Sequence, residues 1–104
     1  MTADETWRSL HDATLETIEL RWESGEVRLR VRTGDAEQPQ RVVVASSVRR
    51  VGCERQLPWG FSASINEVRG PSPAEGELAR VEIEMQSGDV IRIEAVDFCV
   101  RGAD

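Results

Sequence analysis

Apolar and polar residues alternate along two segments that follow almost the same pattern. The residue types match at nearly every position between residues 18–27, IELRWESGEV, and residues 81–90, VEIEMQSGDV. Each segment is an alternating run that leads through Ser-Gly into a second alternating run. Strict alternation is typical of a strand with one buried face, and Ser-Gly between two such runs indicates a tight turn. The pattern predicts two similar β-hairpins.

The pairing of the first hairpin depends on the length of its loop. A two-residue loop at residues 24–25 sets Trp22 opposite Val27 and Leu20 opposite Leu29. A three-residue loop would set these apolar side chains opposite charged ones. Apolar cross-strand pairs on one buried face favour the two-residue loop. This register predicts that Trp22 lies in the core.

The second hairpin carries one extra residue. With residues 87–88 as its loop, Ile83 would face Arg92. A β-bulge sets two residues against one and re-aims the side chains beyond it. A bulge at residues 90–91, Val-Ile, would bring Ile83 opposite Ile93, and we predict one there.

The rest of the chain supplies the remaining strands and loops. β-Branched residues predict a long strand over residues 41–53. Residues 61–65 alternate again, and Val68 falls out of their phase, which predicts an irregularity near residues 66–67. Two loops are predicted where Gly, Pro and polar residues gather, over residues 33–40 and 70–73.

Six antiparallel strands without a long amphipathic helix indicate an all-β fold. We predict a single six-stranded antiparallel sandwich or partly open barrel that contains both Ser-Gly hairpins. The 104 residues correspond to one β domain. Within it, residues 1–12 are predicted to form an N-terminal arm or short helical turn, and residues 102–104 a frayed tail.

The charge of the chain limits its partners. All 13 basic residues are arginines, and the formal net charge is −6 at pH 7. An acidic chain is a poor ligand for duplex nucleic acid and for anionic membranes, so neither is a predicted partner. One stretch with a single acid, Glu54, collects four arginines: Arg41, Arg49, Arg50 and Arg55. Solvated charges are favoured there over a recognition patch, because residues of a strand need not share a face.

The N-terminal segment and the cysteines indicate the cellular compartment of the protein. The N-terminus is acidic without an apolar core, and no apolar run approaches the ~20 residues of a membrane span, so we expect a cytoplasmic protein. Cys53 and Cys99 lie in strand-like runs and are predicted to be buried, inert thiols of a reducing compartment. Two cysteines and one histidine do not complete the usual four-ligand zinc site, and no metal or other cofactor is predicted.

His11 and Asp12 are the one adjacent imidazole and carboxylate. His11 could act as a general base or contribute a metal ligand. Alternatively, Asp12 closes a turn before the first strand and His11 packs beside Leu10. The second interpretation is favoured, because catalytic partners usually come from different elements. The chain contains no nucleophile motif and no phosphate-binding glycine pattern, so no catalytic residue is predicted.

Acids and aromatic residues offer weaker indications. Four acids are expected on the polar faces of the hairpins, between arginines: Glu19, Glu82, Glu84 and Glu94. A solvated face is favoured over a hydrolytic carboxylate pair, which needs a cleft. Trp59, in a Pro-Trp-Gly turn, either plugs the end of a small barrel or anchors an interface, and the plug is favoured because small domains need their large apolar groups.

Four short segments resemble a group of small uncharacterised bacterial all-β proteins: LHDATL at 10–15, PWG at 58–60, SINEVRG at 64–70 and EMQSGD at 84–89. The His-Asp-Ala start is also similar to some immunity proteins of bacterial toxin systems, a more distant likeness. The resemblance implies no established activity. We take as candidate binding residues His11, Asp12, Trp59, Asn66 and Arg69.

These features favour a non-enzymatic protein-interaction module that acts through a sheet face or edge. Sheet edges pair readily, so the partner is another protein or a second copy in a homo-oligomer. An acidic surface also suits an immunity-like inhibitor of a basic toxin. The alternative is a small-ligand or metal-dependent site around His11, Asp12 and Trp59.

Overall fold

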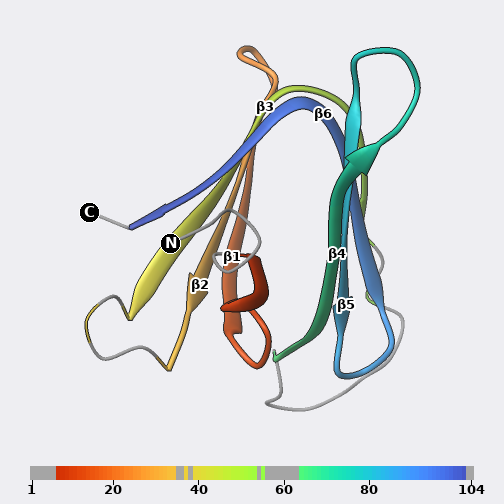
Figure 1. The fold of residues 1–104 in the computed structure, drawn as a ribbon. Coiled ribbons are helices and arrows are strands. Elements are labelled where there is room, and N and C mark those ends of the chain that lie inside the picture. The colour runs from red at the N-terminus through yellow and green to blue at the C-terminus, as the bar shows by residue number, and fades with distance from the viewer. Residues whose placement is uncertain (1–6, 35–36, 38, 54, 56–63, 103–104) are drawn as a thin grey trace.

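The computed structural model is an all-β fold built on one six-stranded antiparallel sheet (Figure 1). The structure describes residues 7–34, 37, 39–53, 55 and 64–102. The strands are β1 (Thr14–Arg21), β2 (Glu26–Arg32), β3 (Gln40–Cys53), β4 (Ile65–Pro73), β5 (Ala79–Met85) and β6 (Val90–Gly102). Their order in the sheet is β1-β2-β3-β6-β5-β4, and the sheet is not closed into a barrel. The predicted all-β, six-stranded antiparallel class is confirmed.

The two longest strands, β3 and β6, bend and fold the sheet onto itself, as Figure 1 shows. One layer holds β1, β2 and the first half of β3, and the other holds β4, β5 and the first half of β6. At the bend of β3 the inward-facing residues Ala45 and Val48 are three positions apart rather than two, Ser47 has a φ of 54°, and the ladder shifts between Val48 and Arg50. Irregular corners of this kind let one strand serve two packed layers.

The core lies between the two layers. Alternate residues of β2, β5 and β6 face it and are almost fully buried: Val27, Leu29, Val31, Val81, Ile83, Met85, Ile91, Ile93 and Ala95. The β-branched and leucine side chains suit a pleated surface with one covered face. Each contributes about 1.5–3 kcal/mol when it leaves water. The alternation in the sequence therefore becomes the inner face of the sheet.

The first hairpin closes with a four-residue loop, Trp22–Gly25, and not with the predicted two-residue loop. Arg21 pairs with Glu26, so Leu20 faces Val27 instead of Leu29. A tight two-residue turn of the usual hairpin type would need Ser24 as well as Gly25 at positive φ. The longer loop places only Gly25 there, at 69°. As a consequence Trp22 leaves the ladder, and the prediction that it lies in the core is wrong: it is 88% exposed.

The second hairpin closes with a three-residue loop at residues 86–88. The Met85 N–H donates to the Asp89 carbonyl at 2.8 Å, and an unbroken ladder follows from Glu84–Val90 onwards. The predicted bulge at residues 90–91 is therefore wrong, because the extra residue is taken up in the turn. Three-residue hairpin loops that end in glycine are a common solution. The two similar sequences consequently differ in both loop and register.

The start of β4 agrees with the sequence prediction, whereas the end of β4 differs from it. The pairing with β5 shifts between Ile65 and Glu67, which confirms the predicted irregularity. Residues 70–73, predicted as a loop, belong to the strand instead. Proline is tolerated there because β4 is an edge strand and one side of its backbone needs no ladder partner. The connection to β5 is formed by residues 74–78.

The prediction that both cysteines are buried is wrong, since both are free and exposed. Cys99 pairs with Val44 and lies on the outer side of the sheet, and Cys53 ends β3 opposite Ile91. Val44 and Cys53 lie on the two sides of the bend of β3, so the cysteines belong to different layers and are not joined by a disulfide.

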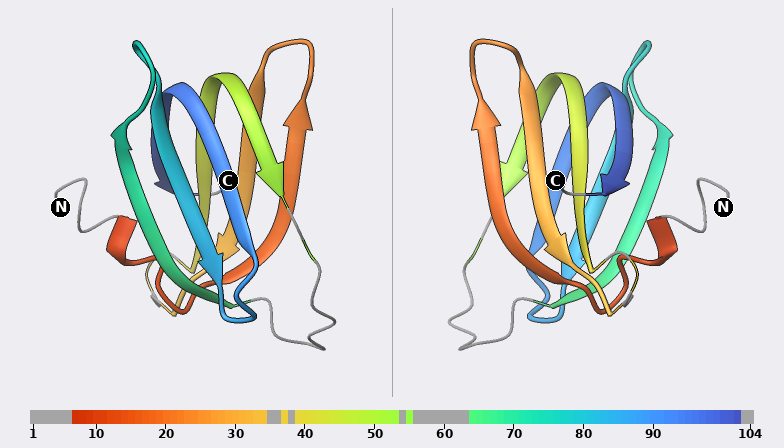
Figure 2. Two further views of the ribbon diagram at one scale, coloured as in Figure 1. Left: turned by 90° about the vertical axis from the view of Figure 1, so that its right-hand side faces the viewer. Right: turned by 90° about the vertical axis from the view of Figure 1, so that its left-hand side faces the viewer.

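A turn at residues 7–12 precedes β1 and begins with a helical stretch at Trp7. Figure 2 shows it beside β4. The Trp7 ring meets Phe98 of β6 edge to face, with centroids 6.3 Å apart, and the Asp12 N–H donates to the Ile65 carbonyl of β4 at 2.8 Å. Trp7 and Leu10 both belong to the core. The turn therefore covers the side of the molecule where β4 and the end of β6 lie.

Candidate functional site

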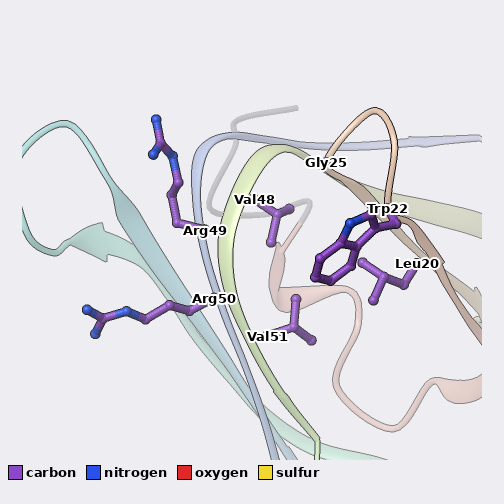
Figure 3. A pocket seen from close by; sticks show the side chains of 7 residues that line it. All are labelled: Leu20, Trp22, Gly25, Val48, Arg49, Arg50 and Val51. Atoms are coloured by element: carbon purple, nitrogen blue, oxygen red, sulfur yellow. The ribbon is translucent and has the colours of Figure 1, made fainter.

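The opposite side of the molecule carries a groove between the first hairpin and the second half of β3. β2 pairs with β3 only as far as Ala45, and the Val48 N–H then donates to the Gly25 carbonyl at 2.8 Å. Among the described residues, no strand pairs with this edge of β3 beyond Val48. The resulting apolar groove has a volume of about 270 Å³ and is lined by Leu20, Trp22, Gly25, Val48, Arg49, Arg50 and Val51 (Figure 3).

Apolar side chains surround this groove. Figure 3 shows Leu20, Trp22, Val48 and Val51 around a common space, while Arg49 and Arg50 extend away from it on the other side of β3. Leu20 and Val51 are 51% and 38% exposed. Their cross-strand partners, Val27 and Ile93, are buried. The groove is therefore a part of the inner face of the sheet that no described residue covers. Exposed apolar side chains in such a cluster mark an interaction surface.

Four of the five predicted binding residues lie together on another side of the molecule, next to β4 and β5. The His11 Nδ1 contacts the main-chain carbonyl oxygen of Asn66, and its Nε2 lies 3.5 Å from an Asp12 carboxylate oxygen. The Asn66 amide donates to Glu84 at 2.7 Å, and an Arg69 guanidinium nitrogen lies 3.5 Å from the same carboxylate. The fifth residue, Trp59, lies outside the described residues.

This polar network holds the N-terminal turn against the sheet. Asp12 receives a hydrogen bond from the Gln86 side chain at 3.1 Å, so one of its carboxylate oxygens is already used within the chain. Within the described ranges no group of three His, Cys, Asp or Glu side chains could hold a metal ion. The contacts of His11, Asp12 and Asn66 connect the turn to β4 and β5, so these residues have a structural role.

A second, arginine groove of about 730 Å³ adjoins the apolar groove and is lined by Arg49, Arg50, Val51, Gly52, Arg80, Arg92 and Glu94. The two grooves share residues 49–51. Of the predicted basic stretch, Arg49 and Arg50 lie here, whereas Arg41 is buried at the start of β3. The groove collects arginines from three strands, β3, β5 and β6.

The prediction that Glu94 lies on a solvated face is wrong, because this residue is buried under these arginines. Its residue is only 7% exposed, because Arg80 and Arg50 cover its carboxylate at 3.1 Å and 3.5 Å. Glu19, by contrast, is exposed beside the first hairpin loop. There the hydrogen bond and the charge of Arg21 hold the pKa of the Glu19 carboxyl below its usual value.

Apart from Arg49 and Arg50, the residues of the two grooves do not stand out in the sequence. The phase of the alternation predicts Trp22 in the core, but Trp22 is the first residue of the four-residue hairpin loop. Arg80 and Gly52 lie on different strands and are 28 residues apart in sequence. The one signal that pointed toward the site was the run of arginines with a single acid.

No helix in the described part of the chain is both long and apolar enough to cross a membrane. Comparison with known protein families, with curated proteins and with solved structures found no match to this chain.

Proposed function

We propose that this protein is a non-enzymatic protein-interaction module, and that an extended segment of a partner protein lies in the apolar groove. The observation that carries the proposal is the exposure of Trp22 together with Leu20 and Val51 beside an unpaired strand edge. Large apolar side chains in water cost free energy that a partner recovers by covering them. Tryptophan is also the residue type that most often dominates binding energy at an interface.

The structure of the groove suits an extended ligand. Two backbone edges flank it, that of β1 and that of β3 beyond Val48, and a strand edge offers unpaired N–H and C=O groups to an added segment. On the opposite side, the chain's own N-terminal turn supplies Trp7 and Leu10 to the core. A short segment with bulky apolar side chains is thus the kind of cover that this fold already uses.

Two other functions receive less support. A second copy of the chain would bring its own formal charge of −6 to the interface, which opposes self-association. A small-ligand or metal-dependent site around His11 and Asp12 would need free ligating atoms, and those residues bind Asn66 and Gln86. A distinct partner protein is therefore the function that we propose.

Trp22→Ala is expected to weaken partner binding at least tenfold without loss of stability. A random dodecapeptide library displayed on phage would be selected on the wild-type protein, and the enriched peptides measured by fluorescence anisotropy on both proteins. The expected loss follows from hot-spot tryptophans, whose truncation costs about 2 kcal/mol or more. The free energy of unfolding should change by no more than about 0.5 kcal/mol, because Trp22 is 88% exposed.

Two valines provide a matched control. Val51 in the groove and Val96 at the bend of β6 are 38% and 37% exposed, so the same substitution to alanine removes similar exposed surface. Val51→Ala should weaken peptide binding several-fold and Val96→Ala should leave it unchanged. The proposed groove would be refuted if the selected peptides bound the wild type and all three variants equally well. It would also be refuted if the library yielded no binding peptide.

A further inference from the structure

The outer face of the layer formed by β4, β5, β6 and the end of β3 carries charges in alternating rows. In one row, Arg50, Glu94 and Arg80 are direct neighbours across β3, β6 and β5. In the next row, Arg92, Glu82 and Arg69 are neighbours across β6, β5 and β4. Within these two rows the signs alternate across the strands, and they also alternate between the rows on β5 and β6, which is favourable for neighbouring side chains on a sheet.

Ion pairs connect the members of these rows on β3, β5 and β6, whereas Arg69 of β4 pairs with Glu67 and Glu84. Arg80 and Arg50 lie 3.1 Å and 3.5 Å from the Glu94 carboxylate, and the Arg92 Nε donates to Glu82 at 2.9 Å. Each acid is thus held by an arginine of a neighbouring strand. The guanidinium groups are kept in place by these contacts and still lie mostly in water, with the Arg50 and Arg92 side chains 71% and 58% exposed.

Gly52 interrupts the second row. It pairs with Arg92 on the β3 side, where the alternation would place an acid, but it has no side chain. A Cβ built on Gly52 meets no atom within 4 Å, so the position opens into space. This is the position over which the arginine groove lies. In a chain with a formal net charge of −6, its lining contains four arginines and one acid.

We propose that a carboxylate side chain of the partner occupies the space over Gly52 and completes the row beside Arg92, within reach of Arg50 and Arg49. The inference rests on the proposed function and specifies the partner: an extended protein segment with Asp or Glu next to bulky apolar residues. The two grooves lie on opposite faces of β3 and share Val51, and a segment paired along the free edge of β3 directs alternate side chains to both faces. Arginine forks bind carboxylates through paired, charge-assisted hydrogen bonds.

Gly52→Glu tests the proposal because it supplies the missing acid from the chain itself. The probes are the Trp22-dependent peptides from the display experiment and synthetic versions in which every Asp and Glu is replaced by Asn and Gln. Binding of the acidic peptides to Gly52→Glu should be at least tenfold weaker than to the wild type. The amide versions should bind the wild type at least tenfold more weakly than their acidic parents.

Gly34→Glu is the matched control. It adds the same charge at another exposed glycine with free space around it, and peptide binding should stay within twofold of the wild type. Arg49→Gln is a second test that does not disturb the rows, since no ion pair of Arg49 is found among the described residues, and it should weaken binding several-fold.

The outcomes separate the two proposals. Peptides that require Trp22 but contain no acid, or that bind Gly52→Glu as tightly as the wild type, would overturn the carboxylate site and leave the apolar groove intact. Equal weakening by Gly52→Glu and Gly34→Glu would show a general charge effect and would also overturn it. The absence of any Trp22-dependent peptide would refute the proposed function itself, and this inference with it.

Discussion

Leu10→Ala is expected to lower the free energy of unfolding by about 2–5 kcal/mol, whereas Leu20→Ala should lower it by less than about 1 kcal/mol. The chemical change is identical. Leu10, in the N-terminal turn, is fully buried, and its removal leaves a cavity in the core. Leu20 is 51% exposed in the apolar groove, so its truncation removes only part of a hydrophobic contact. Chemical denaturation followed by far-ultraviolet circular dichroism measures both values.

The comparison is a direct test of which side of the fold is covered in solution. A loss for Leu20→Ala as large as that for Leu10→Ala would show that Leu20 is buried in solution, and the apolar groove would then not be available to a partner. A small loss for Leu10→Ala would contradict the packing of the N-terminal turn. A concentration dependence of the Leu20→Ala value would point to a second copy as the cover.

Gly70→Ala is expected to lower the free energy of unfolding by about 3 kcal/mol. Gly70 has a φ of 102°, where side chains are strained, and its Cβ would lie 2.3 Å from the Arg80 carbonyl oxygen on β5. Unfavourable backbone conformations alone cost about 1–3 kcal/mol, and the clash with a neighbouring backbone cannot be relieved by a side-chain rotation. The pairing of β4 with β5 should loosen at this point.

Gly76→Ala distinguishes the strain of a positive φ from the clash with the neighbouring strand. Gly76 also has a positive φ, 62°, but a Cβ there meets nothing within 4 Å. Gly76→Ala should lower the free energy of unfolding by only about 1 kcal/mol, the typical penalty of the left-handed conformation. Urea denaturation of the two variants under the same conditions gives the difference. Equal losses would show that the contact with Arg80 contributes nothing.

The fold class followed from the sequence because alternation is a local property. Ile83 and Leu29 are buried as the pattern indicates, and the strands lie close to their predicted positions except for β4, which continues through residues 70–73, where a loop is predicted. Alternation says which face points inward but not whether another layer covers it. Leu20 and Val51 have the pattern of core residues and remain exposed, because the bend of β3 and β6 decides what lies opposite them.

The hairpin registers and the grooves depended on information that single positions do not carry. The same Ser-Gly pair ends a four-residue loop in one hairpin and a three-residue loop in the other. The arginine groove joins β3, β5 and β6, so its composition follows from strand order. Four of the predicted binding residues instead lie in one polar network that holds the N-terminal turn: His11, Asp12, Asn66 and Arg69.

The two exposed cysteines give the protein a built-in pair of labelling positions. Cys53 continues the line of Val51 along the unpaired edge of β3, whereas Cys99 lies on the outer side of the other layer. An environment-sensitive dye on Cys53, in a Cys99→Ser variant, should change its emission when a peptide fills the apolar groove. The same dye on Cys99, in a Cys53→Ser variant, should not respond. Because the chain has no lysine, amine-reactive quenchers can be directed to its N-terminus alone.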